Sequence, residues 1–292
     1  MADDTAAARA APAATEADYI AGLVRAGDQD RYWSGLMMPS PLREHLFALY
    51  AFNIELSRIG EQAREPALGE IRLQWWRDVL DAAPGGEPSG HPVADALTAA
   101  RTAHDLPADV LAGMIDARGL DVQRESLASM GALDAYLQAT AGAVFRLGAW
   151  IAGARGQDAA HASGDAALAW GLTGVMRALP FHSARGQLYL PAEFLRAFGV
   201  EAGSVLAGED SEGLRAALGV LRERAGEALA SYRAHGSALP AAALPVFLPL
   251  ALVPAYLRRL ADPGLRPLAE IAQLNPLARF ARIWMSNLRG KV

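Results

Sequence analysis

The 292-residue chain contains no cysteine and carries no excess of basic residues. The absence of cysteine excludes disulfide bonds, thiolate zinc sites and a cysteine nucleophile, and it is compatible with any compartment. Lysine and arginine number 27 against 32 aspartate and glutamate residues, which gives a net charge of −5. Without a basic excess, a nucleic-acid partner has no electrostatic support. We therefore expect a protein that binds no nucleic acid.

Isoleucine, valine and threonine are sparse, whereas alanine, leucine and arginine dominate the chain. The scarce residues favour strands and the abundant ones favour helices. Hydrophobic residues make up 52% of the sequence, which is enough for a large core. Because no internal repeat or long linker interrupts the pattern, we predict a single all-α domain over residues 16–292.

The first 15 residues carry Asp3 and Asp4 and have no unbroken apolar core. They resemble neither a secretory signal nor an arginine-rich, acid-poor mitochondrial import signal. We expect residues 1–15 to form a disordered arm. The expected location is the cytoplasm, with peripheral contact to the inner membrane left open.

A charge-free run from Ala238 to Leu257 is about as long as a membrane-spanning helix. Four prolines interrupt it, and a proline in a helix interior costs about 3 kcal/mol. We therefore predict a buried, kinked helix or helix pair here, and no transmembrane span.

Apolar residues recur at spacings of three and four along most of the chain, which predicts amphipathic helices. The predicted helices begin near Glu16 and then cover approximately 41–59, 66–83, 93–104, 108–126, 130–154, 159–179, 211–234 and 276–288.

Three segments carry a pattern that a helical core does not require. They are RYWSGLMMP (31–39) followed by ALYAFNIELSRIGE (48–61), YLQATAGAV (136–144) and TGVMRALPFHSARGQLYLP (173–191). Together they resemble the squalene/phytoene synthase family over nearly the whole chain, and the last aligns without a gap on the family pattern TNILRDVGEDARRGRIYLP. The resemblance implies an all-α isoprenoid-synthase fold with a central cavity, in which family enzymes join two prenyl diphosphates head to head.

Family enzymes bind magnesium through paired carboxylates on two facing helices, and magnesium requires oxygen ligands. The residues at the corresponding motif positions here are Ser57, Arg58 and Glu61 in the first motif and Ala178, Phe181 and His182 in the second. One carboxylate, Glu61, remains. We therefore expect no metal and no catalytic residue, and magnesium only if the protein proves to be an active prenyltransferase.

One branch of this family shows the same combination, namely the assembly factors of respiratory complex I. The segments AFNIEL (51–56), IRLQWWR (71–77), RALPFH (177–182) and PVFL (245–248) resemble that branch. Asn53 and Glu55 within AFNIEL are the more telling positions, because core packing does not dictate them. The resemblance implies complex I subunits or assembly intermediates as partners.

The family pattern also places further residues around the cavity. The expected lining residues are Tyr50, Asn53, Glu55, Tyr136 and Tyr189. Arg58, Arg177 and Arg185 are expected either to form an anion pocket for a phosphorylated lipid or to make salt bridges with Glu55 and Glu61.

His182 is expected to be a hydrogen-bonded structural histidine. A general base, a lipid-phosphate partner and a metal ligand remain alternatives for it. For the adjacent Trp75 and Trp76, which point about 100° apart on a helix, only one side chain can face the core fully.

Three functions stay open. The first is a non-catalytic factor in complex I assembly, which the paired absence of metal ligands favours. The second is an active, magnesium-dependent prenyltransferase that condenses two molecules of farnesyl or geranylgeranyl diphosphate. The third is metal-free binding of an isoprenoid or phospholipid in the retained cavity, which is compatible with the first.

Overall fold

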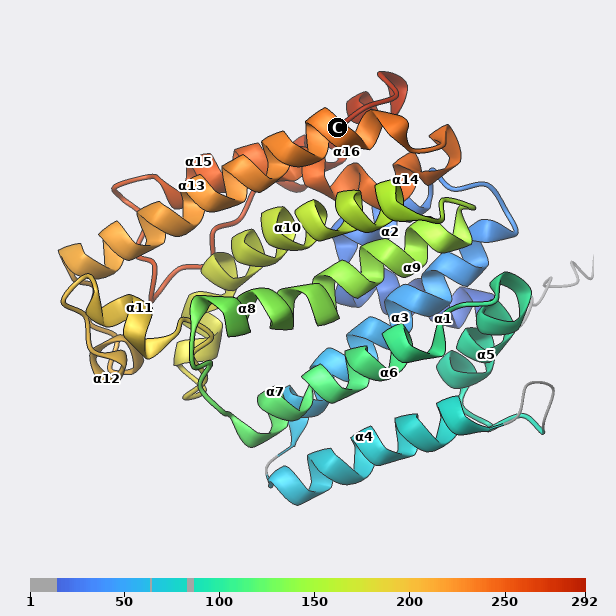
Figure 1. Ribbon diagram of the computed structural model, residues 1–292, viewed down its shortest axis with the longest axis horizontal. Helices are drawn as coiled ribbons and strands as arrows, with labels where there is room; N and C mark the ends of the chain where they lie inside the picture. Colours follow the sequence, from blue (N-terminus) through green and yellow to red (C-terminus); the bar gives the residue numbers. More distant parts are fainter. Residues whose placement is uncertain (1–14, 64, 83–86) are drawn as a thin grey trace, which may run out of the picture.

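The computed structural model describes residues 15–63, 65–82 and 87–292 (Figure 1). All regular elements in these ranges are helices, which confirms the all-α prediction. The predicted arm lies outside the described residues except for Thr15. The α-helices are α1 (Glu16–Gly27), α2 (Gln29–Gly35), α3 (Leu42–Gln62), α4 (Pro66–Asp81), α5 (Pro92–His104), α6 (Ala108–Ala117), α7 (Gly119–Gln123), α8 (Met130–Leu137), α9 (Ala143–Ile151), α10 (Gln157–Ser183), α11 (Ala192–Arg196), α12 (Ala202–Leu206), α13 (Glu212–His235), α14 (Leu244–Phe247), α15 (Val253–Leu260) and α16 (Pro276–Leu288).

Helices begin where the sequence supplies a cap or a first-turn proline. Thr15 forms a capping box with Asp18, in which each side chain accepts a hydrogen bond from the other residue's backbone N–H. Ser211 caps α13 and Asn275 caps α16 through their side-chain oxygens. Proline occupies the first turn of α4, α5 and α16, where its missing N–H has no helical partner to lose.

The predicted helix over 108–126 is divided in the structure. It breaks at Arg118, and Gly119, a poor helix former, begins the short α7. α7 ends at Gln123, and its C-cap residue Arg124 has a left-handed φ of 53°. The prediction missed this break, which turns Arg118 and the first turn of α7 toward the centre of the molecule.

The predicted end of the helix over 159–179 is also wrong. α10 continues through Pro180 to Ser183, so the second motif region lies in the last turns of a 27-residue helix. Pro180 removes one backbone donor near the C-terminal end, where few further hydrogen bonds depend on it. The side chains of Phe181 and His182 are therefore held on a regular helix.

The helices form roughly parallel layers (Figure 1). α10 packs along α13, and α3 packs against α1, α5 and α9. α4 lies at the outer edge beside α6 and α7, and α15 and α16 lie on the opposite side of the molecule.

The core consists of two large clusters of buried apolar side chains. The first joins α1, α3, α5 and α9 with the first half of α10, and includes Leu49, Phe52 and Phe145. The second joins α8, α13 and the second half of α10, and includes Leu172 and Leu221. The cavity described below lies where these two clusters meet.

The proline-rich run folds into α14, a 3₁₀ helix (Leu248–Leu252) and α15, as its prolines predict. By length and composition, Ala241–Leu260 could cross a membrane, but 61% of its most apolar window is buried inside the protein. Leu250, Val253 and Tyr256 are fully buried. Core packing therefore accounts for its hydrophobicity.

Candidate functional site

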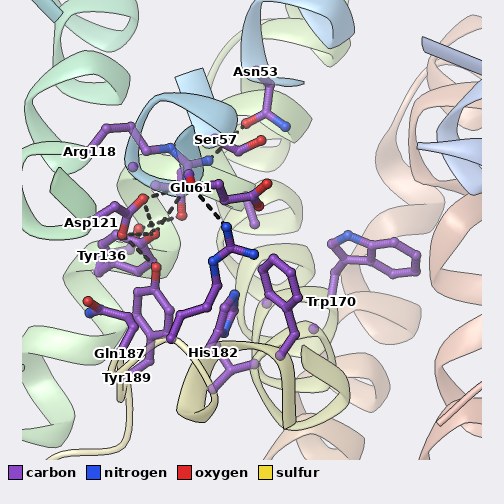
Figure 2. A pocket seen from close by; sticks show the side chains of 18 of the residues that line it. Asn53, Ser57, Glu61, Arg118, Asp121, Tyr136, Trp170, His182, Gln187 and Tyr189 are labelled. Carbon is purple, nitrogen blue, oxygen red and sulfur yellow. Dashed lines mark hydrogen bonds and ion pairs between the residues drawn. The ribbon is translucent and has the colours of Figure 1, made fainter. Parts of the chain in front are cut away.

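A cavity of about 240 Å³ opens between α3, α7, α8 and α10 (Figure 2). α3 supplies its side chains one turn apart, because positions 53, 57 and 61 share one helix face. The residues around the cavity are Arg31, Asn53, Ser57, Gly60, Glu61, Arg118, Asp121, Arg124, Tyr136, Thr140, Ala141, Trp170, Gly171, Gly174, Val175, Phe181, His182, Arg185, Gln187 and Tyr189.

Asp121, the acceptor at the centre of one wall, is only 8% exposed. The hydroxyl of Tyr189 donates to its Oδ1 at 2.7 Å, and the hydroxyl of Tyr136 donates to the same oxygen at 2.8 Å. Nη1 of Arg118 lies 3.0 Å from its Oδ2. Three donors on three different segments therefore hold this carboxylate in place, as Figure 2 shows.

Arg118 extends the network to α3. Its Nη2 donates to Oδ1 of Asn53 at 3.3 Å, and its Nη1 also donates to the hydroxyl of Tyr136 at 3.1 Å. Burial alone would lower the pKa of Arg118, but the neighbouring Tyr136 and Asp121 raise it above its usual value. Arg118 therefore stays charged, and Asn53 is anchored by a buried cation.

Both tyrosines remain hydroxyl donors at neutral pH. Burial is the largest cause that raises the pKa of Tyr136, and burial together with Tyr136 raises that of Tyr189. The network can orient a bound group or hold the fold together, but its tyrosines cannot act as bases near neutral pH.

Among the first-motif positions, the structure places Ser57 and Glu61 at the cavity. Ser57 donates to the carbonyl of Ile54 at 2.9 Å, and Glu61 lies exposed at the rim. Arg58 lies instead at a separate surface pocket with Glu55, where Trp75, Trp76 and His91 also lie. Positions 55 and 58 are on another face of α3, since each helical residue turns the direction by about 100°.

Phe181 and His182 line the cavity, whereas Ala178 does not. The ring of His182 packs against the ring of Tyr189, with centroids 4.8 Å apart. Its Nδ1 is buried and has no hydrogen-bond partner among the described residues, so the predicted hydrogen bond is not found at that atom. Burial lowers the pKa of His182 to about 4, and the imidazole is neutral at pH 7.

The three arginines of the predicted anion pocket do not converge. Nε of Arg177 donates to the carbonyl of Ala272 at 3.1 Å, and its guanidinium stacks on the ring of Tyr256. Arg185 does lie at the cavity, where Nη2 donates to the backbone carbonyl of Glu61 at 2.9 Å.

The predicted salt bridges are also absent among the described side chains. None of Arg58, Arg177 and Arg185 has a carboxylate of Glu55 or Glu61 within 4 Å.

The expected lining residues divide in the same way. Asn53, Tyr136 and Tyr189 line the cavity, whereas Tyr50 is buried in the core with 1% exposure. The Tyr50 hydroxyl has no hydrogen-bond partner in the part of the chain that the structure describes. Trp76 is buried and Trp75 is 38% exposed, as their adjacent positions predict.

Sequence reasoning missed Arg31, Arg118 and Asp121. Arg118 and Asp121 stand at the i, i+3 spacing of an ion pair, but that spacing is equally typical of an exposed helix surface. Arg31 lies in the RYWSGLMMP segment, and its position in the family pattern was the only available signal.

Arg31 is a buried cation in an aromatic setting. Its Nη1 lies 2.9 Å from Oδ2 of Asp28, and its guanidinium carbon lies 5.5–5.8 Å from the rings of Tyr50, Phe145 and Trp170. Its Nη2 and the Nε of Arg118 are buried, with no hydrogen-bond partner among the described residues. Both arginines also line the cavity.

The carboxylates around the cavity do not match the needs of magnesium. Glu61 stands alone at the rim, and Asp121 is held by three donors. In the described part of the chain, no cluster of three or more His, Cys, Asp or Glu side chains could hold a metal ion. Magnesium requires near-octahedral oxygen ligands, usually including carboxylates.

Residues 24–277 match the sequence model of the family described as squalene/phytoene synthase. The chain belongs to the squalene/phytoene synthase family. This confirms the resemblance that the three motif segments predicted.

Curated relatives of this family member fall into two groups. The mouse (Mus musculus) protein "NADH dehydrogenase (ubiquinone) complex I, assembly factor 6" is 28% identical over 83% of this chain and 73% of its own length. Phytoene synthase from Thermus thermophilus is 31% identical over 76% of this chain and 75% of its own length. The family is thus clear, while relatives of similar identity include both an assembly factor and an enzyme.

Solved structures of family members share the fold. Squalene synthase HpnC from Alicyclobacillus acidocaldarius superimposes with a TM-score of 0.74 at 23% identity, over 85% of this chain and 95% of that one. A dehydrosqualene synthase gives a TM-score of 0.80 at 16% identity, over 94% and 96% of the two chains. At these identities the likeness establishes the fold alone, and it confirms the predicted isoprenoid-synthase architecture.

Proposed function

We propose that this squalene/phytoene synthase family member is a non-catalytic factor in the assembly of respiratory complex I. One observation carries the proposal. Of the six residues at the two motif positions, Ser57, Glu61, Phe181 and His182 face one cavity, and only Glu61 is a carboxylate. We therefore propose that the protein has lost both aspartate-rich magnesium motifs and needs no metal cofactor.

The neighbouring chemistry offers no replacement for the missing ligands. Asp121 is the other carboxylate that lines the cavity, and its hydrogen bonds to two tyrosines and Arg118 oppose its use as a metal ligand. The imidazole of His182 could coordinate a metal only as a nitrogen ligand, whereas magnesium prefers oxygen. A leaving diphosphate would therefore lack the bridging ions that family enzymes supply.

The size of the cavity points the same way. Its volume of about 240 Å³ is below the roughly 300–1,000 Å³ of typical small-molecule sites. Two prenyl diphosphates side by side would need considerably more room. The volume suits a single small group better than a pair of substrates.

The relatives supply the proposed role. The mouse, bovine, rat and human relatives are all named as complex I assembly factor 6, and each aligns over more than four fifths of this chain. We take complex I subunits or assembly intermediates as the partners. The proposed location is the cytoplasm, at the face of the inner membrane where such a membrane complex is assembled.

Deletion of the gene in the source organism tests this role. The expected result is a lower content of assembled complex I on native gels and slower NADH oxidation by membranes, both restored by the intact gene. Normal complex I content and normal NADH oxidation in the deletion strain would falsify the proposal.

A separate assay tests catalytic silence. The purified protein is incubated with farnesyl or geranylgeranyl diphosphate and magnesium, beside a squalene or phytoene synthase as positive control. We expect no condensed product. Turnover at a rate comparable to the control enzyme would establish the prenyltransferase alternative instead.

Metal-free binding of an anionic group in the cavity is a second proposed function. Arg31, Arg118, Arg124 and Arg185 line the cavity against Glu61 and Asp121, which leaves a positive excess. Native mass spectrometry of the purified protein should reveal a bound isoprenoid phosphate or phospholipid, and a ligand-free mass after mild purification would contradict this function.

A further inference from the structure

The outward side of α16 is apolar. Five large side chains on it are exposed, with exposed fractions of 80% for Leu277, 60% for Leu288, 44% for Trp284, 39% for Phe280 and 38% for Met285. At 100° per residue, these five and Ala281 lie on one side of the helix. We call these six residues the α16 apolar face. An ordinary surface helix turns its charged side outward, so this arrangement is reversed.

Contacts on the opposite side fix α16 in this orientation. Ile283 and Ser286 are buried against the protein, and Nε of Arg279 lies 2.8 Å from Oδ1 of Asp30 on α2. At the edge of the apolar face itself, the ring of Phe280 meets the ring of Trp33 edge to face, with centroids 5.9 Å apart. The apolar face is therefore held toward solvent, and α16 lies at the outer edge of the molecule (Figure 1).

Basic residues lie along one side of this face. From Ile271 to Val292 the chain has no acidic residue, although the whole protein carries a net charge of −5. A surface pocket of about 660 Å³ beside α16 is lined by four basic residues and no acidic one. We call these residues the basic cluster: Arg233, Arg282, Arg289 and Lys291.

The basic cluster is not neutralised within the protein. Among the described side chains, none of its four members lies within 4 Å of a carboxylate. Arg282 donates only to the backbone carbonyl of Ala278. The cluster therefore presents positive charge without an ion pair among the described residues, next to an apolar surface.

These features together fit an anionic lipid surface. A helix with tryptophan, phenylalanine and leucine on one side and basic residues beside them is typical of helices that lie in the membrane interface. Tryptophan favours the headgroup level, and clustered lysine and arginine bind acidic lipids.

A second exposed apolar stripe, on α4, offers a comparison that favours a lipid surface as the binding partner of the α16 apolar face. On α4, Leu68, Ile71 and Trp75 are exposed, but the same helix carries charges of both signs, such as Glu70 and Arg72. Mixed charge suits a protein partner, whereas charge of a single sign suits an acidic membrane.

We propose that the α16 apolar face and the basic cluster dock on the surface of an anionic lipid bilayer. The apolar side chains enter the boundary between headgroups and acyl chains, and the arginines and Lys291 contact lipid phosphates. This inference concerns a surface that shares no lining residue with the cavity, and it does not depend on the proposed role in complex I assembly.

Vesicle flotation of the full chain tests the proposal. We expect binding to vesicles that contain phosphatidylglycerol and phosphatidylcholine, weaker binding to phosphatidylcholine alone, and weaker binding at high salt. Removing two basic charges with the double variant Arg289→Gln/Lys291→Gln should lower the partition coefficient by about 25-fold, at about fivefold for each basic residue. The matched control Arg25→Gln/Arg196→Gln, which removes two exposed arginines elsewhere, should bind as the wild type does.

The apolar part is tested in parallel. The double variant Trp284→Ser/Leu288→Ser changes exposed positions and should fold normally by circular dichroism, yet lose most of its vesicle binding. Leu68→Ser/Ile71→Ser on α4 is the matched control and should retain binding. Equal binding by wild type and the α16 variant would overturn the proposal. A second result would also overturn it: a wild-type protein that does not bind vesicles but forms dimers, with Trp284→Ser/Leu288→Ser remaining monomeric. The α16 apolar face would then bind a second copy of the chain.

Discussion

Replacement of Asp121 should destabilise the fold far more than an ordinary loss of an ion pair. Asp121→Ala removes the acceptor of two tyrosine hydroxyls and leaves Arg118 buried without its counter-charge. Breaking a buried ion pair on one side costs about 3–5 kcal/mol. Asp121→Asn keeps the shape and one acceptor oxygen, so we expect a smaller loss of about 2–4 kcal/mol.

These free energies convert into a measurable shift of the unfolding temperature. For 292 residues, the unfolding entropy is about 0.6 kcal/mol/K, so each kcal/mol is worth roughly 1.6 °C. Asp121→Ala should therefore lower the Tm by about 5–8 °C in differential scanning calorimetry.

The matched control is a surface pair of the same type. Asp116 lies 2.9 Å from Nη2 of Arg77, and its side chain is 64% exposed. Asp116→Asn should cost less than about 1 kcal/mol, because exposed pairs contribute little. If Asp121→Asn and Asp116→Asn proved equally stable, the buried network would not hold the site together, and the structural role assigned to Asp121 would be wrong.

Three further results are expected. Gly60→Ala should lower the free energy of unfolding by about 1–3 kcal/mol, because the added Cβ would lie 2.8 Å from Cβ of Asp121. Gly226→Ala, where the added Cβ meets open space, should raise the free energy of unfolding by up to about 1 kcal/mol. Urea unfolding measures both changes, and two changes of the same sign would contradict the close approach of α3 and α7. Burial lowers the pKa of His182 to about 4, so the unfolded chain takes up its proton first as the pH falls below 6.5, and folding stability drops through that window. Between pH 7 and pH 5 the wild type should lose up to about 2 kcal/mol more than His182→Gln, and parallel pH profiles of the two proteins would show that His182 is not the source. Inorganic diphosphate should raise the Tm equally in magnesium and in EDTA, and Arg31→Met should reduce the effect; a shift seen only with magnesium would indicate a metal site.

The positions of the helices along the chain were largely predictable from the sequence, because apolar periodicity and helix caps are local signals. Pro276 and the cap residue Asn275 mark the start of α16, and the predicted end at Leu288 agrees with the structure. One failure arose because the effect of a local signal depends on its position in the helix. Pro180 predicts a helix end, yet α10 continues to Ser183, because a proline this close to the C-terminal end costs few helical hydrogen bonds.

The site was only partly predictable for a different reason. Spacing shows which residues share a helix face, and it correctly grouped Ser57 with Glu61 on α3. It does not show which face turns inward, so Arg58 and Arg177 were assigned to a cavity that they do not reach. Asp121 escaped notice because its significance depends on Tyr136 and Tyr189, which only the tertiary fold brings to it.

The position of the polar network between the two apolar clusters has a consequence for stability. Asn53 lies on α3, which contributes many side chains to the first cluster, while Tyr136 and Tyr189 lie at the second cluster. Arg118 and Asp121 connect these residues by hydrogen bonds. The network therefore adds directional hydrogen bonds between two parts of the core that α10 already joins by running through both. A ligand that contacts both Arg31 and Arg118 is therefore expected to stabilise the folded protein as a whole, because it binds where the two clusters meet.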